Sequence, residues 1–314
     1  MPKKQRTLLL TGASGFVGRN VCAKAVADGW RVQALVRDAK RLPPGVTAII
    51  VPDLSVPSKE LSLAWDEAVR NCLVEQTAVI HLAGRAHIIH DVQGNGAAEF
   101  HRHNVVSAVL ARQESFSRGV RRFIFVSSIG AVTGGSSDAA VDENFPAHPT
   151  SPYGRSKLEA ERALLALNLP GLVIVRPPLV YGPGAPGNIR RLAQLVRSGI
   201  PLPFGRIQNR RSLIHVANLA EVLLLCCEHE RAAGRVFHVR DYADFSTIDL
   251  LEKAADRLGR RLRLFSVPLW SLRFLMKLLG QADAFERITG SLQVDDRLIR
   301  QHLGWHPTQH PFEI

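Results

Sequence analysis

The stretch Thr11-Gly12-Ala13-Ser14-Gly15-Phe16-Val17-Gly18 decides the fold of this chain. It follows the short apolar run 7–10, which has the character of a buried strand, and precedes apolar residues at helical spacing that end before Gly29. Glycines between a strand and a helix let the backbone approach a pyrophosphate, and the helix N-terminus offers free N–H groups to that anion. The stretch therefore predicts a dinucleotide site, with cofactor contacts from Gly12, Ser14, Gly15, Phe16, Val17 and Gly18.

Composition and length indicate a soluble globular protein. The chain has 314 residues, of which 46% are hydrophobic, and its apolar run at 222–227 is too short to span a bilayer. Few apolar residues precede the glycine stretch, so we expect no signal peptide and a cytoplasmic location. The four cysteines form no Cys-x-x-Cys pair, which favours buried thiols in a reducing compartment.

The formal net charge of +12 limits the possible partners. Its basic clusters lack interleaved aromatic residues and any nucleic-acid reader motif, so we predict no nucleic-acid binding. A basic protein also attracts a phosphorylated small substrate, which we favour. Histidines lie close together at His87 and His90 and at His101 and His103, but no flanking acid or cysteine completes a ligand set, so we predict no metal site.

The first half alternates between strand-like and helix-like segments. We expect strands over 7–10, 31–36, 47–51, 77–82 and 122–127, and helices over 16–29, 58–71 and 97–117. This alternation predicts an α/β protein with a doubly wound parallel sheet that binds ligands at the carboxyl ends of its strands. We expect a dinucleotide-binding part at 1–178 and a smaller α/β, mainly substrate-binding part at 179–314, with segments near 212–240 returning to the first.

The ends of the predicted strands supply further cofactor contacts. The second strand ends in Arg37 where NAD-binding proteins usually have an acid, which favours the 2′-phosphate of NADP; Asp38 next to it keeps NAD open. Small residues after the fourth strand leave room for the nicotinamide ribose. The predicted contacts on and between these elements are Arg37, Asp53, Leu54, Leu82, Ala83, Gly84, Asn104 and Pro177.

The segment from Ser151 to Lys157 opens a helix, with Ser151 as its N-cap and a proline in its first turn. Tyr153 and Lys157 lie four residues apart and therefore share one helical face. A free tyrosine titrates near pH ~10, and a nearby ammonium is expected to lower that pKa. The pair is therefore suited to proton transfer at a sugar oxygen and to contact with the cofactor.

In the glycine stretch, the strand ending Ser127-Ser128 and the Tyr153/Lys157 pair, the sequence resembles the extended short-chain dehydrogenase/reductase family, of the nucleotide-sugar epimerase, dehydratase and reductase kind. The resemblance covers nearly the whole chain. It implies a Rossmann fold, Tyr153 as the acid/base, Lys157 as its partner, and Ser128 as the hydrogen-bond donor to the reacting oxygen. Ser127 is a possible substitute for Ser128.

The second half extends the resemblance. Its strand and Tyr-Gly-Pro loop at 173–184 resemble those of the family, although Leu179 stands where nucleotide-sugar members commonly have Asn. The resemblance implies that Arg211 meets the nucleotide, and Arg287 is a second candidate for its diphosphate, since guanidinium forks match phosphate oxygens. The loop 85–96 is expected to line the substrate cleft. The predicted substrate contacts are Arg85, His87, Ser128, Arg211 and Arg287.

Dehydratases of the family carry an Asp-Glu pair directly after the catalytic Ser or Thr, whereas Ile129 and Gly130 follow Ser128 here. Two reactions remain: 4-epimerisation of a UDP-hexose with retained NAD, and 4-keto reduction with NADPH. Arg37 favours the reductase. The sequence most resembles bacterial O-antigen proteins that reduce a UDP-4-keto-6-deoxy-N-acetylhexosamine. Other readings are a non-catalytic dinucleotide-binding regulator and a reductase of steroid- or flavonoid-type ketones.

The segment 267–280 is predicted to be an apolar helix, which we assign to core or subunit packing in preference to a peripheral membrane contact. The resemblance also implies a possible homodimer, formed through the Tyr153 helix and its neighbour.

Overall fold

The computed structural model describes residues 5–86, 96–278, 280–308 and 312. Its main sheet has seven strands in the order β3-β2-β1-β4-β5-β6-β9, and all six adjacent pairs are parallel. The strands are β1 Thr7–Thr11, β2 Arg31–Val36, β3 Val46–Ile50, β4 Thr77–His81, β5 Arg122–Val126, β6 Leu172–Arg176 and β9 Arg235–His238. The predicted Rossmann-type parallel sheet is confirmed. The strand order reverses between β1 and β4, where ligands bind in such folds.

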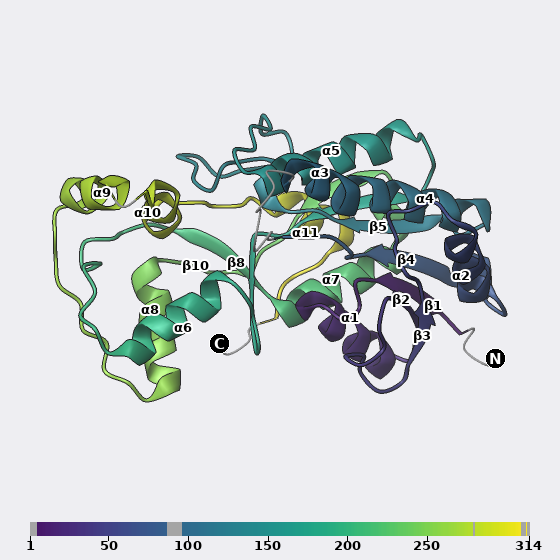
Figure 1. The fold of residues 1–314 in the computed structure, drawn as a ribbon, viewed down its shortest axis with the longest axis horizontal. Helices are drawn as coiled ribbons and strands as arrows, with labels where there is room; N and C mark the ends of the chain where they lie inside the picture. The colour runs from purple at the N-terminus through teal and green to yellow at the C-terminus, as the bar shows by residue number, and fades with distance from the viewer. Residues whose placement is uncertain (1–4, 87–95, 279, 309–311, 313–314) are drawn as a thin grey trace.

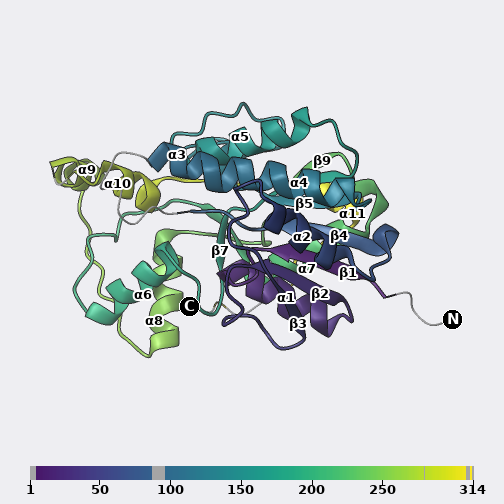
Figure 2. The same cartoon turned by 45° about the vertical axis from the view of Figure 1, so that its right-hand side comes forward.

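Alternate residues of each strand send their side chains to opposite faces of this sheet. Leu8 and Leu10 of β1 join one apolar cluster with helices α1 (Phe16–Ala27), α7 (Val216–Glu228) and α11 (Arg297–Leu303), whereas Leu9 joins another cluster on the opposite face. That second cluster includes α2 (Lys59–Val69), α4 (Ser107–Ser117) and α5 (Pro152–Ala166). The sheet is therefore the middle of three layers, as Figures 1 and 2 show.

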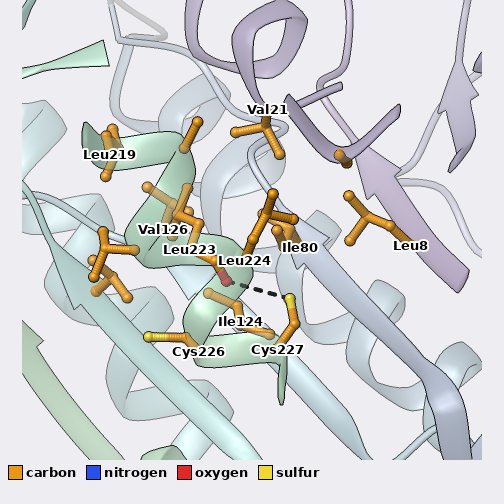
Figure 3. Packing of buried hydrophobic residues seen from close by; sticks show 14 of the residues in the cluster. Leu8, Val21, Ile80, Ile124, Val126, Leu219, Leu223, Leu224, Cys226 and Cys227 are labelled. Atoms are coloured by element: carbon orange, nitrogen blue, oxygen red, sulfur yellow. Dashed lines mark hydrogen bonds between the residues drawn. The ribbon is translucent and has the colours of Figure 1, made fainter. Parts of the chain in front are cut away.

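Helix α7 fills much of the first cluster. Figure 3 shows its Leu223 and Leu224 between Val21 of α1 and the strand residues Ile80 and Ile124. Cys226 and Cys227 lie in the same cluster, and the Cys227 thiol donates to the Leu223 carbonyl at 3.3 Å. Each large apolar side chain buried in this way contributes about 1.5–3 kcal/mol to folding.

A second, three-stranded sheet has the order β10-β8-β7. Its strands are β7 (Leu179–Tyr181), β8 (Arg211–His215) and β10 (Asp244–Phe245). Helices α6 (Asn188–Ser198), α8 (Thr247–Leu258), α9 (Leu269–Leu278) and α10 (Ala282–Thr289) lie beyond it at one end of the molecule (Figure 1). Between these elements the chain returns to the main sheet, where α7 packs on α1 and β9 pairs with β6. The division at residue 178 stays a prediction.

The expected helix over 97–117 is continuous in space but not in hydrogen bonding. It consists of α3 (Gly96–Phe100), a π-helical segment η2 (His101–Val106) and α4. The short 3-10 helices are η1 (Val74–Gln76), η3 (Ile129–Ala131) and η4 (Glu230–Ala232). Among the described residues, no helix combines the length and the apolar character needed to cross a bilayer.

Candidate functional site

The glycine loop between β1 and α1 lies directly against the end of β4. Gly12 has φ +74°, and a Cβ there would stand 2.6 Å from the Ala83 nitrogen. A Cβ on Gly18 would stand 2.2 Å from the Gly12 carbonyl oxygen. Side chains at either position would force the loop and helix apart. These two glycines therefore fix the β1–α1 turn against β4 and keep it free of side chains.

Gly15 is the N-cap of α1, and no side chain caps this helix end. The side chains of the first two helical residues point into the protein, because Phe16 packs against the cluster around Tyr181 and Val17 against the main core. An uncapped helix start beside a bare glycine turn fits a pyrophosphate.

A cavity of about 240 Å³ opens from this loop. It fits the adenosine side of a dinucleotide, because the ends of β1, β2, β3 and β4 all reach it. Of the predicted cofactor residues, those that line the cavity are Gly12, Ser14, Gly15, Arg37, Asp53, Leu54, Leu82, Ala83 and Gly84. Sequence reasoning missed Ser55, His103 and Ser107, which also line it; no motif marks these residues.

Arg37 and Asp38 differ in their position at the end of β2. Arg37 lines the cavity and is exposed. Asp38 does not line it, and its carboxylate instead accepts from the Lys40 backbone N–H at 2.9 Å and lies 3.7 Å from the Lys40 ammonium. The position that selects the ribose substituent therefore carries a cation on the cavity wall.

Asp53 lines the same cavity as the glycine loop, and hydrogen bonds fix the position of its carboxylate. It accepts from the backbone N–H and the hydroxyl of Ser55 at 2.8 and 2.6 Å. Burial opposes its ionisation, but the Ser55 hydrogen bonds and the charges of Arg102 and His103 hold its pKa below the usual value. Asp53 is thus an ionised acceptor at the cavity.

Arg85 stands at the rim of the same cavity and pairs with Glu99 at 3.1 Å. The structure places it on the cofactor side, so its predicted contact with substrate stays a prediction. His87, the other loop residue expected to bind substrate, lies outside the described residues.

Helix α5 carries the predicted catalytic pair and is seated by close backbone packing. Ser151 caps it, accepting from the Gly154 backbone N–H at 3.0 Å. A Cβ on Gly154 would stand 2.1 Å from the Gly130 carbonyl oxygen, so the first turn of α5 rests directly on η3. This contact brings Tyr153 to the serine strand end.

Ser128, rather than Ser127, faces Tyr153. The Ser128 hydroxyl accepts from the Gly130 backbone N–H at 3.1 Å and is hydrogen-bonded to the Tyr153 phenol. The Ser127 hydroxyl is buried without a hydrogen-bond partner among the described residues. Burial raises the pKa of Tyr153 to about 12, and the Ser128 hydrogen bond only partly offsets this rise. The expectation that Lys157 lowers this pKa is therefore wrong for the structure, because burial of the phenol dominates.

Lys157 is buried beneath Tyr153. Its ammonium donates to the Val126 carbonyl at 2.8 Å and lies 4.6 Å from the centre of the Phe125 ring. Burial lowers the pKa of Lys157 to about 8, and the nearby Glu161 carboxylate partly counters this effect. The lysine is thus charged at neutral pH but close to releasing its proton.

His81, at the end of β4, is fully buried near Lys157. The Thr11 hydroxyl accepts from the Ala83 N–H at 3.3 Å and pairs with His81 Nδ1 at 2.9 Å. Burial and the charge of Lys157 lower the pKa of His81 to about 3, so the ring is neutral. The hydrogen bond between Thr11 and His81 joins the end of β1 to the end of β4 beside the glycine loop. The sequence alone does not predict this contact, because the two residues meet only when the strands pair.

Asn104 lies in the π-helical segment η2 and is fully buried. Its side-chain oxygen accepts from the Arg85 backbone N–H at 2.7 Å, and its amide donates to the Arg85 carbonyl at 3.0 Å and to the Ser156 hydroxyl at 2.8 Å. These contacts join the loop after β4 to α5. Asn104, which the sequence predicts to contact the cofactor, therefore holds the loop after β4 against α5, because its side-chain amide is already hydrogen-bonded within the protein.

A buried ion pair one turn beyond Lys157 was not predicted. Glu161 of α5 accepts from two nitrogens of Arg176, at 3.0 and 2.6 Å. Arg176 also lies 3.4 Å from His238, whose backbone N–H donates to Glu143. The glutamate four residues after Lys157 is the only sequence signal for this pair. Pro177, which follows Arg176, accepts from the Ile129 backbone N–H at 2.9 Å and so joins β6 to η3.

The two arginines predicted to meet a diphosphate come together. Arg211, at the start of β8, donates to the Gly290 carbonyl at 2.7 Å. Burial, and to a smaller extent the neighbouring charge of Arg287, lower the pKa of Arg211. A bound dianion would relieve the repulsion between these two like charges. Gly290 also lines an open cavity of about 530 Å³ between α9, α10 and residues 136–138.

Within the described part of the chain, no three His, Cys, Asp or Glu side chains are grouped to hold a metal ion. The site consists instead of a dinucleotide cradle, a Ser128-Tyr153-Lys157 constellation and an arginine pair.

Comparison with known proteins shows the family to which the chain belongs. The model of the NAD dependent epimerase/dehydratase family matches residues 8–240. A UDP-glucose 4-epimerase of Vibrio cholerae is 36% identical over 313 residues, which cover 98% of this chain and 92% of that protein. The chain belongs to the NAD dependent epimerase/dehydratase family.

Two solved structures show the fold of this family. The UDP-glucose 4-epimerase of Thermotoga maritima, solved with UDP-glucose, has a TM-score of 0.74 and 20% identity, and the match covers 97% of this chain and 94% of that one. The enzyme WbmG of Bordetella bronchiseptica, solved with NAD and UDP, has a TM-score of 0.73 and 19% identity, with coverage of 99% and 92%. The resemblance to the nucleotide-sugar enzymes of this family is confirmed, and dinucleotide-dependent chemistry follows from it.

Proposed function

We propose that this family member reduces the 4-keto group of a UDP-4-keto-6-deoxy-N-acetylhexosamine with NADPH, in the synthesis of O-antigen sugars. The observation that carries the choice of reaction is Arg37 on the wall of the cofactor cavity, with the Asp38 carboxylate directed to Lys40. A guanidinium pairs with a 2′-phosphate, whereas a carboxylate would repel it. NADPH is the usual reductant of a net reduction.

The Tyr153 site can supply the proton that this reduction needs. A phenol whose pKa is about 12 is neutral at pH 7 and begins the cycle as an acid. Reduction of a ketone needs such an acid. Bound NADPH would supply the hydride to C4. Tyr153 gives its proton to the C4 oxygen, so that a carbonyl becomes an alcohol, and Ser128 donates a hydrogen bond to the same oxygen.

The arginine pair supports a substrate that is bound through a nucleoside diphosphate group. Arg211 and Arg287 lie close enough for mutual repulsion, and a diphosphate would be held by both guanidinium groups. The name of the Vibrio cholerae relative, a UDP-glucose 4-epimerase, favours uridine as the base.

The test supplies NADPH and the UDP-4-keto-6-deoxy sugar to the purified protein and follows the absorbance of NADPH. We expect NADPH to be consumed in a 1:1 ratio to sugar, and an Arg37→Glu variant to lose most of its preference for NADPH over NADH. Equal use of both cofactors by the parent protein would contradict the role of Arg37.

The second candidate is a UDP-hexose 4-epimerase with retained NAD, which the name of the 36% identical relative favours. An epimerase would interconvert UDP-glucose and UDP-galactose without added NADPH and would release NAD on denaturation. Those two results, together with no net NADPH consumption, would favour the epimerase over the reductase.

A further inference from the structure

Helix α9 leaves most of its large apolar side chains exposed. Only one face of it is inside, where Leu272 is 7% exposed and packs with Phe285 of α10. The outer face carries large apolar side chains, of which Trp270 is 75%, Phe274 68% and Leu278 75% exposed. Positions four apart share a helical face, so these three residues form a continuous apolar stripe. Leu275 extends it on one side, and Leu269 lies at the start of the helix beside the cavity; we call these five residues the α9 face.

The α9 face is at the extremity of the molecule. Figures 1 and 2 both show α9 at one end of the long axis, with α10 on its inner side and the N-terminus near the opposite end. Among the described residues, no other element covers this stripe. A protruding helix at an extremity can meet an extended flat surface without interference from the rest of the fold.

The charges on α9 suit an anionic surface. Arg273 and Lys277 are exposed beside the apolar stripe, and α9 itself contains no acidic residue, although Glu286 of α10 lies 3.9 Å from the Arg273 guanidinium. A helix with tryptophan, phenylalanine and leucine on its open side, flanked by cations, matches the pattern of helices that lie in a bilayer interface.

A second copy of the chain fits the α9 face less well. Apolar area does not separate the two occupants, because five side chains at these exposures present on the order of 500 Å², close to the apolar share of the roughly 800 Å² that each partner buries in a standard interface. Charge does separate them: two copies meeting on this face would bring the Lys277 ammonium groups toward each other, whereas anionic lipid headgroups neutralise them.

We propose that the α9 face docks on an anionic lipid bilayer, with Trp270, Phe274 and Leu278 in the interface and Arg273 and Lys277 on the headgroups. This contact does not depend on the reaction that the Tyr153 site performs. It brings the cavity lined by Leu269, Trp270 and Gly290 close to the membrane surface.

The structure provides its own reporter for the test. Of the four tryptophans, Trp30, Trp65 and Trp305 are at most 6% exposed, so Trp270 alone reports on the surface. The full chain is mixed with vesicles of phosphatidylcholine and phosphatidylglycerol, and with vesicles of phosphatidylcholine alone. We expect co-sedimentation and a blue shift of tryptophan emission with the anionic vesicles, both weakened by added salt.

Substitution identifies the face. Trp270→Ser with Phe274→Ser should lower the partition coefficient by about tenfold or more. Arg273→Gln with Lys277→Gln should remove the preference for anionic lipid. The matched control is Leu63→Ser with Leu73→Ser, which removes two apolar side chains of 54% and 52% exposure far from α9 in sequence and should leave binding unchanged.

Three results would overturn the proposal. They are absence of vesicle binding by the parent chain, unchanged binding by the Trp270/Phe274 double variant, and a dimer in sedimentation equilibrium that this variant dissociates. The third result would assign the α9 face to subunit contact. Circular dichroism and NADPH binding of each variant show that the fold is intact.

Discussion

Replacement of Lys157 by Met should make the protein more stable at neutral pH while it abolishes activity. The side chain is buried, and burial lowers the pKa of Lys157 from 10.5 to about 8. That difference corresponds to roughly 3 kcal/mol of free energy against the charged form at pH 7. Met avoids this cost but leaves the Val126 carbonyl without its donor, which costs about 1 kcal/mol. The net expectation is a gain of about 2 kcal/mol, or roughly 4 °C in melting temperature.

The pH dependence of this gain follows from the direction of the shift. The unfolded chain keeps the Lys157 proton up to about pH 10.5, whereas the folded chain releases it near pH 8. Below pH 8 the wild type carries the full penalty, and between pH 8 and 10.5 its free energy of unfolding rises as the folded lysine becomes neutral. The advantage of Lys157→Met therefore shrinks over this window.

The assay is denaturant unfolding of wild type and Lys157→Met at pH 7, 9 and 10.5, with the exposed Lys59→Met as matched control. The difference between proteins cancels the titration of the buried Cys22 and Tyr153, whose raised pKa values lower stability in alkali. Glu161 stays paired with Arg176 in the variant, so no new unpaired charge is created. Two results would contradict the predicted cost of burying the Lys157 charge. One is a Lys157→Met protein that is less stable than wild type by more than about 1 kcal/mol at pH 7. The other is a difference in free energy of unfolding between the two proteins that does not change with pH.

Other substitutions test the remaining parts of the site. Tyr153→Phe should lower kcat by about 10²–10⁴ while the dissociation constant of NADPH stays nearly unchanged, and a loss below about tenfold would exclude Tyr153 as the proton donor. Gly12→Ala should abolish NADPH binding, measured by fluorescence, because its Cβ would meet the Ala83 nitrogen at 2.6 Å; Gly234→Ala, with nearly the same φ of +73° and nothing within 4 Å, should bind normally. Arg211→Gln should remove most of the thermal stabilisation by UDP, and an undiminished shift would place the diphosphate elsewhere.

Much of the cofactor half of the site could be predicted from sequence, because each strand end is marked by local pattern. The glycine stretch, the cation at Arg37 and the helix start at Ser151 all depend on neighbouring residues alone. The strand topology then brings these distant segments to one edge of the sheet, and most of the residues predicted to contact the cofactor line one cavity there.

The missed features depend on contacts between distant segments. The π-helical turn at Asn104 follows from its hydrogen bonds to Arg85 and Ser156, which no helical pattern encodes. The raised pKa of Tyr153 follows from burial, which the one-turn spacing to Lys157 does not reveal. For the α9 segment the sequence leaves core and subunit packing open, because its apolar composition fits both; the exposure of Trp270 and Phe274 follows from its place at the end of the fold.

The most direct test of the reaction is single-turnover reduction with NADPH deuterated at C4 of the nicotinamide, on the face that the enzyme uses. The account predicts one deuterium on C4 of the UDP-sugar product for each NADPH oxidised, and none when Tyr153→Phe is used for the same time. An alcohol product that carries no deuterium at C4, or interconversion of UDP-glucose and UDP-galactose without net NADPH oxidation, would contradict it.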